Sequence, residues 1–217
     1  MKKSARTRTT LYTIGYERAR PDAVLDALKH AKVKLLVDTR AVAASRRPGF
    51  SKRQLAAALD ECGIAYAHLQ KLGTPAEGRV ANHTGDMKTF WRVYEKQLKT
   101  PEAKEAMGEL VALVESGKPV CLLCYERDPA QCHRSRIAEI VHARTKARIA
   151  DLIPPCSDYS AGCATRRPRS TSLTRNATAA VPITKPSATI AVTISTRSNP
   201  PRPYKTEIIH TATPEIT

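Results

Sequence analysis

The sequence VCLLC at residues 120–124 decides the fold class, because it is an unbroken apolar run only five residues long. A strand of this composition is buried on both faces, as in parallel sheets that are covered by helices. The sequence DPAQ follows at 128–131 and combines a capping aspartate, a proline suited to a first helical turn and a glutamine at capping distance. We therefore expect a strand, a short loop and a helix in succession, which is the repeating order of an α/β domain.

The same alternation of short apolar runs and helical periodicity extends over residues 10–153. Residues 69–85 show neither pattern and are expected to be a long irregular segment. The predicted fold is an α/β single domain with a mainly parallel sheet of about five strands flanked by helices. Strands are expected at 10–14, 33–37, 64–68, 120–124 and 148–153, and helices that begin near residues 21, 52, 87, 101 and 129.

The composition changes after Ile153. Residues 154–217 carry 12 Thr, 9 Pro and 7 Ser without sustained apolar periodicity, so this tail is expected to be disordered. Within it, residues 188–194 alternate and would at most add a lone edge strand. The tail is either native or a frame-shifted or fused extension. The chain thus divides into a basic arm at 1–9, an α/β domain at 10–153 and a low-complexity tail at 154–217.

The chain is strongly basic, with 36 Lys+Arg against 20 Asp+Glu and a net charge of +16. Up to Ile153 there are 28 basic and 17 acidic residues, and beyond it there are 8 and 3, so both parts are positive. Positive surfaces attract nucleic acids and small anions alike. With only two Phe and one Trp, however, the chain lacks the aromatic platform that is typical of single-strand binders.

No stretch approaches the roughly 20 apolar residues of a membrane-spanning helix, and the basic start is not followed by the apolar core of a signal peptide. Six cysteines in 217 residues do not make a dense disulfide framework and fit a reducing compartment. We therefore expect a cytoplasmic protein without a membrane partner. The sequence indicates no particular cofactor and no oligomeric state.

Ionisable side chains gather at one edge of the predicted sheet, where the carboxyl ends of parallel strands meet and ligands usually bind. The opposite strand ends offer little beyond Lys34, Lys118 and Arg148. This asymmetry predicts a functional cleft. The candidates, strand by strand, are Tyr16, then Asp38, Arg40 and Arg46, then His68, then Cys124 and Glu126, and finally Cys132, His133 and Arg134 at the start of the next helix.

Cys124 is the strongest chemical candidate, because a basic cluster and a helix N-terminus nearby would lower the pKa of its thiol. A small buried strand residue is an equally good interpretation. A zinc site would use Cys121, Cys124, Cys132 and His133. Cys121 and Cys124 are three apart on a strand, however, and should face opposite ways. A redox pair of these two cysteines would need to lead into a helix, and it leads into a loop. We therefore expect no metal ligands.

The other candidates take supporting roles. Glu126 suits a general acid or base. Cys132 is expected on the opposite side of the helix from His133, which is either a core residue or a catalytic one. Arginine is suited to bidentate binding of phosphate and carboxylate groups. We expect Arg40, Arg46 and Arg134 to hold an anion, Asp38 to orient one of these arginines, and Tyr16 and His68 to line the same site.

Several motifs occur in a fixed order along the chain. They are TIGY at 13–16, VDTR at 37–40, SRRPGFS at 45–51, Tyr66 with HL at 68–69 and LG at 72–73, LCYE at 123–126 and CHR at 132–134. Together they resemble the DUF488 family over about residues 10–153. The resemblance implies a small cytosolic α/β domain with these polar positions in its cleft, and it implies no reaction. Thr39, Thr74 and Tyr125 depart from the residues that are usual at their positions.

The leading hypothesis is an enzyme-like pocket for an anionic substrate that contains a phosphate or a nucleotide, with Cys124 and Glu126 as the reactive pair. One alternative is a non-catalytic nucleic-acid-binding module, which the net charge favours. The other is a structural zinc-binding domain.

Overall fold

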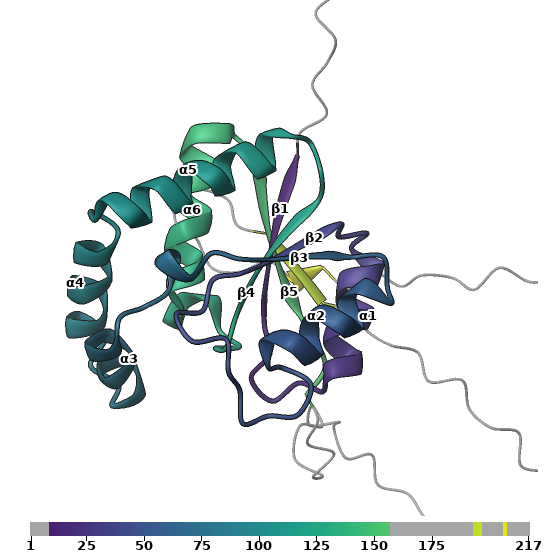
Figure 1. Ribbon diagram of the computed structural model, residues 1–217, viewed down its shortest axis with the longest axis horizontal. Coiled ribbons are helices and arrows are strands. Elements are labelled where there is room, and N and C mark those ends of the chain that lie inside the picture. Colours follow the sequence, from purple (N-terminus) through teal and green to yellow (C-terminus); the bar gives the residue numbers. More distant parts are fainter. Residues whose placement is uncertain (1–8, 157–192, 197–205, 208–217) are drawn as a thin grey trace, which may run out of the picture.

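Seven strands form the sheet of the computed structural model, which describes residues 9–156, 193–196 and 206–207 (Figure 1). The strands are β1 (Thr10–Gly15), β2 (Leu35–Asp38), β3 (Ala65–His68), β4 (Val120–Cys124), β5 (Arg148–Ile153), β6 (Thr193–Thr196) and β7 (Thr206–Glu207). Their order is β3-β2-β4-β1-β5-β6-β7, in which the first five are parallel and the last two antiparallel. The α-helices are α1 (Pro21–His30), α2 (Lys52–Asp60), α3 (Ala76–His83), α4 (Met87–Gln97), α5 (Pro101–Glu115) and α6 (His133–Thr145), with 3-10 turns η1 (Gln70–Leu72) and η2 (Pro129–Gln131).

The strand at 120–124 is buried on both faces, as the sequence predicts. Val120 and Leu122 pack into a core with α5 and α6, whereas Cys121 and Leu123 pack into a second core with α1 and α2. Figure 1 shows these two helix pairs on opposite sides of the sheet. The predicted α/β fold with five parallel strands is therefore confirmed.

The connections that follow two adjacent strands, β1 and β4, run to opposite faces of the sheet. β1 leads to α1 on one face of the sheet, and its neighbour β4 leads to α6 on the other face. Such a divergence is where open α/β sheets bind ligands. Gly15 pairs with Cys124 at this point, so Cys124 ends its strand where the two connections separate.

Residues 69–85 are not irregular, and that prediction is wrong. They contain η1 and α3, and α3 packs against α4. The buried positions of α3 are the small residues Gly78 and Ala81, so no stripe of large apolar side chains marks the helix in the sequence. Its start signals are only Pro75 at the N-cap and Glu77 in the first turn.

The helix expected from residue 129 begins later. Asp128 caps only the 3-10 turn η2, in which its carboxylate accepts a hydrogen bond from the backbone N–H of Ala130. Cys132 then adopts extended dihedral angles, with φ −132° and ψ 136°. α6 therefore begins at His133, and Cys132 is its N-cap residue. This break decides where the side chains of both residues point.

Two short segments of the predicted tail at residues 154–217 form strands. β6 pairs with β5, and β7 pairs with β6; the alternating segment at 188–194 overlaps β6 by two residues. The remainder of the tail from residue 157 on lies outside the described residues, as does the arm up to residue 8. The division into arm, domain and tail thus stays a prediction. None of the helices in the described ranges is long and apolar enough to cross a membrane.

Candidate active site

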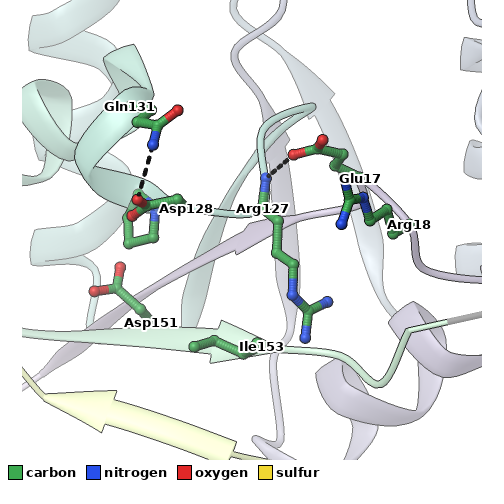
Figure 2. Close-up of a pocket in the computed structure, with 8 residues that line it drawn as sticks. Glu17, Arg18, Arg127, Asp128, Gln131, Asp151 and Ile153 are labelled. Carbon is green, nitrogen blue, oxygen red and sulfur yellow. Dashed lines mark hydrogen bonds between the residues drawn. The ribbon is translucent and has the colours of Figure 1, made fainter. Parts of the chain in front are cut away.

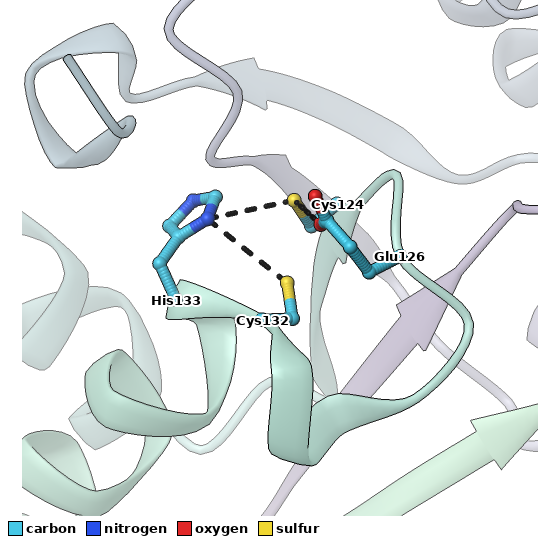
Figure 3. A group of neighbouring side chains, drawn as sticks. All are labelled: Cys124, Glu126, Cys132 and His133. Carbon is cyan, nitrogen blue, oxygen red and sulfur yellow. Dashed lines mark hydrogen bonds between the residues drawn. The ribbon is translucent and has the colours of Figure 1, made fainter. Parts of the chain in front are cut away.

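Four side chains from the region between β4 and α6 form a cluster: Cys124, Glu126, Cys132 and His133 (Figure 3). One sulfur, oxygen or nitrogen atom of each lies within 4.8 Å of those of the others. The Cys124 thiol donates to Glu126 Oε2 at 3.0 Å. His133 Nδ1 lies 3.6 Å from Cys124 Sγ and 4.0 Å from Cys132 Sγ. The structure thus brings together the four residues that the sequence predicts to be catalytic.

The break before α6 places Cys132 in this cluster. The sequence predicts Cys132 on the opposite side of the helix from His133, and this is wrong because Cys132 precedes the helix in an extended conformation. The loop that carries Glu126 lies against the end of β1. The backbone carbonyl oxygen of Glu126 occupies the position that a side chain on Gly15 would need. A side chain at position 15 would therefore displace the backbone that carries Glu126.

His133 presents a lone pair to both thiols. Its Nε2 lies 3.0 Å from the carbonyl oxygen of Thr39. A carbonyl oxygen only accepts hydrogen bonds, so Nε2 carries the proton and Nδ1 of the neutral ring is the acceptor. Burial opposes a charge on this ring, but Cys132 and Glu126 act against burial and raise the pKa of His133. The imidazole can therefore take up a proton from a thiol.

The two thiols differ in acidity, and the lowered pKa that the sequence suggests for Cys124 falls on Cys132 instead. Burial and the neighbouring Cys132 raise the pKa of Cys124 well above that of an ordinary thiol. Burial acts on Cys132 too, but the contact with Cys124, the Arg134 guanidinium and His133 outweigh it and lower the pKa of Cys132 well below the ordinary value. The N-terminus of α6 also favours an anion there. These directions favour Cys132 over Cys124 as the more acidic thiol of the pair.

Glu126 can exchange a proton near neutral pH. Burial and the negative charge of Cys132 raise the pKa of Glu126 to about 7. Its second oxygen, Oε1, accepts a 2.9 Å hydrogen bond from the side-chain amide of Asn82 on α3. Asn82 is missing from the candidates chosen by sequence because nothing in residues 69–85 indicates a helix at this edge of the sheet.

Arg134 is fully buried and binds the loop that carries Glu126. Its Nε donates to the hydroxyl of Thr13 at 3.2 Å, and its two terminal nitrogens donate to the backbone carbonyl oxygens of Glu126 and Arg127. These bonds fix the loop that carries Glu126. They use three of the five guanidinium donors, and the positive charge of Arg134 acts on the pKa of Cys132.

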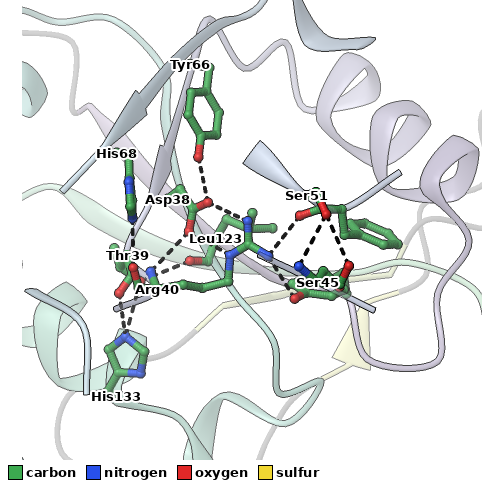
Figure 4. Close-up of polar contacts among 11 residues, drawn as sticks. Asp38, Thr39, Arg40, Ser45, Ser51, Tyr66, His68, Leu123 and His133 are labelled. Atoms are coloured by element: carbon green, nitrogen blue, oxygen red, sulfur yellow. Dashed lines mark hydrogen bonds and ion pairs between the residues drawn. The ribbon is translucent and has the colours of Figure 1, made fainter. Parts of the chain in front are cut away.

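Asp38 and Arg40 form a buried ion pair after β2 (Figure 4). Arg40 Nε and Nη2 donate to the two Asp38 oxygens at 2.8 and 2.6 Å. Its Nη1 donates to the Tyr16 hydroxyl at 2.8 Å and to the Phe50 carbonyl oxygen at 3.0 Å. The Tyr66 hydroxyl donates to Asp38 at 2.7 Å. Four of the five guanidinium donors are thus used within the protein, which gives this network a role in holding the loops after the strands.

The last two predicted residues, His68 and Arg46, are not members of the cysteine cluster. His68 Nε2 is 2.8 Å from the carbonyl oxygen of Arg40 and so belongs to the network around Asp38. Arg46 is exposed, and its guanidinium has no hydrogen-bond or ion-pair partner in the part of the chain that the structure describes. Among the three arginines expected to hold an anion, Arg46 is therefore the one whose donors face solvent.

A cavity of about 470 Å³ opens beside the loop that follows β4 (Figure 2). Arg127 lies in its wall, where its backbone N–H donates to Glu17 and its guanidinium donates to the carbonyl oxygen of Pro154. Glu126 precedes Arg127, but no member of the cysteine cluster lines the cavity. The cysteine cluster thus forms no part of the wall of this cavity.

Two thiols, an imidazole and a carboxylate are also the donor types of zinc sites. This set differs from the one considered by sequence, because Cys121 packs into the core on the other face of β4 and Glu126 joins the cluster instead. The same separation excludes a disulfide between Cys121 and Cys124. Elemental analysis of the purified protein distinguishes a metal site from free thiols.

Comparison with known proteins identifies a family but no activity. The model of the family described as "Domain of unknown function DUF488" matches residues 20–141, which is more than half of the chain. The match includes the whole cysteine cluster, Arg134 and the Asp38 and Arg40 pair, whereas Tyr16 precedes it. No curated protein and no solved structure matches the chain. The chain belongs to the DUF488 family.

Proposed function

We propose that this protein is a thiol-dependent enzyme in which Cys124, Cys132 and Glu126 form the reactive group. The observation that best supports this proposal is the contact between the Cys124 thiol and Glu126 Oε2 at 3.0 Å, with both sulfurs next to His133 Nδ1. A nucleophilic thiol needs a nearby base and a means of stabilising its thiolate. His133 and the Arg134 charge provide these for Cys132.

Glu126 completes the proposed reaction by handling a proton. With a pKa of about 7 it is partly protonated at neutral pH, so it can protonate a leaving group when Cys132 attacks an electrophilic substrate. Asn82 holds the carboxyl group in place through Oε1 and leaves Oε2 to the reacting groups. Asn82 is a positioning residue in this scheme.

The substrate is small, because Cys132 and His133 are almost wholly buried. An anionic group on it, such as a phosphate or a nucleotide, is favoured by the net charge of +16. Arg46 is the predicted arginine with donors left for such a group. Nucleic-acid binding without catalysis has the same net charge in its favour and predicts steep loss of affinity with added salt.

Alkylation with iodoacetamide, followed by peptide mass spectrometry, tests the thiol chemistry in the full chain. At pH 6 an ordinary thiol with a pKa of about 8.5 is ionised to less than about 1%. We expect Cys132 to be modified faster at this pH than the exposed Cys156. If Cys132 and Cys124 in the native protein react no faster than the core residue Cys121, the proposed function is wrong.

A further inference from the structure

The two thiols of the cluster lie close enough to bond to each other. Cys124 Sγ and Cys132 Sγ are within 4.8 Å, and each contacts the same nitrogen of His133. Figure 3 shows the sulfurs on the same side of the imidazole. A disulfide needs the sulfurs about 2.05 Å apart, so the two side chains must move closer together for the bond to form.

We propose that Cys124 and Cys132 are a dithiol redox couple that reduces a small hydroperoxide and closes to an intramolecular disulfide. This inference rests on the proposed function, since it uses the same thiolate, and it names the substrate class. Two observations favour such a substrate. Cys124, Cys132 and His133 are buried, which disfavours a bulky substrate, and a second thiol lies beside the first.

In the first step the Cys132 thiolate attacks the terminal oxygen of the hydroperoxide ROOH. A sulfur–oxygen bond forms and the oxygen–oxygen bond breaks, which leaves Cys132 as a sulfenic acid. The departing alkoxide takes the proton of Glu126 and leaves as ROH. The sulfur is oxidised by two electrons, and the peroxide is reduced by the same two.

In the second step the Cys124 sulfur attacks the sulfur of the Cys132 sulfenic acid. The sulfur–sulfur bond forms, the sulfur–oxygen bond breaks, and the hydroxide takes up the proton of the Cys124 thiol to leave as water. Glu126 Oε2 can relay this proton, because it already accepts the thiol hydrogen bond at 3.0 Å. Glu126 ends as a carboxylate, and a dithiol reductant returns the disulfide to two thiols.

Treatment of the full chain with hydrogen peroxide tests the redox couple. We expect the loss of two of the six thiols and a disulfide-linked peptide pair that contains Cys124 and Cys132. In Cys124→Ser the second step is blocked, so a sulfenic acid should accumulate on Cys132 and be trapped by dimedone. In Cys132→Ser neither product should form. Cys121→Ser is the matched control, because it removes a buried thiol from the other face of the same strand, and it should behave like the wild type.

The redox couple and the proposed function can fail separately. If Cys132 is alkylated rapidly at pH 6 but peroxide yields no disulfide between Cys124 and Cys132, the redox couple is wrong and the thiol enzyme stands. A trapped sulfenic acid on Cys124 instead of Cys132 overturns the assigned order. One equivalent of bound zinc with both thiols resistant to peroxide also overturns the couple.

Discussion

Gly15 lies against the backbone of Glu126, in a position where even a methyl group would overlap the Glu126 carbonyl oxygen. The two residues are far apart in the sequence, and their contact joins the end of β1 to the loop after β4. Arg134 donates a hydrogen bond to the same carbonyl oxygen. These two contacts hold the backbone of Glu126 and so fix the position of its carboxylate.

Gly15→Ala should destabilise the protein and disturb the cluster. The added methyl meets backbone atoms, which cannot rotate away as a flexible side chain can. We expect a loss of about 1–3 kcal/mol in the free energy of unfolding, as for other overpacked sites, measured by urea denaturation. Gly108→Ala is the control: it lies in α5 with nothing within 4 Å of an added methyl, so it should gain up to about 1 kcal/mol. Equal effects of the two substitutions would contradict the close contact.

Asp38→Asn should be among the most damaging substitutions outside the cluster. It leaves the buried guanidinium of Arg40 without its countercharge, a change that costs about 3–5 kcal/mol in other buried pairs. Glu77→Gln breaks an exposed pair with Arg92 at 3.6 Å and should cost less than about 1 kcal/mol. Thermal unfolding of the two variants measures this difference. If Asp38→Asn lowers the thermal stability no more than Glu77→Gln does, the ion pair of Asp38 and Arg40 does not stabilise the fold.

Glu126 should make stability fall as the pH rises. Its pKa in the folded protein is about 7, against an ordinary 4.5, so the folded state holds this proton more tightly than the unfolded state. The resulting stabilisation is complete below about pH 4.5 and is lost as the pH rises through 7. The side chain in Glu126→Gln cannot ionise and therefore avoids the cost of a buried carboxylate at high pH. At pH 8 this variant should be about 1–3 kcal/mol more stable than the wild type. Parallel pH profiles of the two proteins would show that the carboxyl group is not perturbed.

Thr74→Val should stabilise the protein. The Thr74 hydroxyl is buried and has no hydrogen-bond partner in the described part of the chain, so a methyl group of similar shape removes an uncompensated polar atom at a gain of about 1 kcal/mol. Thr13→Val is the contrasting case. Its hydroxyl donates to Asp151 at 2.6 Å and accepts from Arg134, and its loss should cost about 1–3 kcal/mol. Chemical denaturation that ranks the two variants in the other order would refute this reading.

The strands could be predicted from the sequence because a strand buried on both faces needs a short apolar run, and VCLLC supplies one with alternate residues in two different cores. α3 could not be predicted, because a helix that buries Gly78 and Ala81 shows no large apolar periodicity. Its partner contact from Asn82 to Glu126 was missed for the same reason.

The members of the site could be predicted better than their roles. Their types and their places after the strands point to one edge of the sheet, and the four cluster residues do meet there. The acidity of the thiols depends on the groups that act on each of them, and the extended backbone that makes Cys132 the N-cap residue of α6 is seen only in the folded structure. The donors of Arg40 and Arg134 are likewise assigned only by the folded structure.

The most direct test of the account is a pH titration of the ultraviolet absorbance of thiolates in the wild type, Cys132→Ser and Cys124→Ser. We predict one thiolate in the wild type that ionises well below the ordinary value of about 8.5. It should be absent from Cys132→Ser and kept in Cys124→Ser, where Arg134 and His133 still favour the Cys132 thiolate. A wild type whose thiols all ionise at or above that value, or a low-pH thiolate that disappears with Cys124 instead, would contradict the assignment of Cys132 as the reactive thiolate.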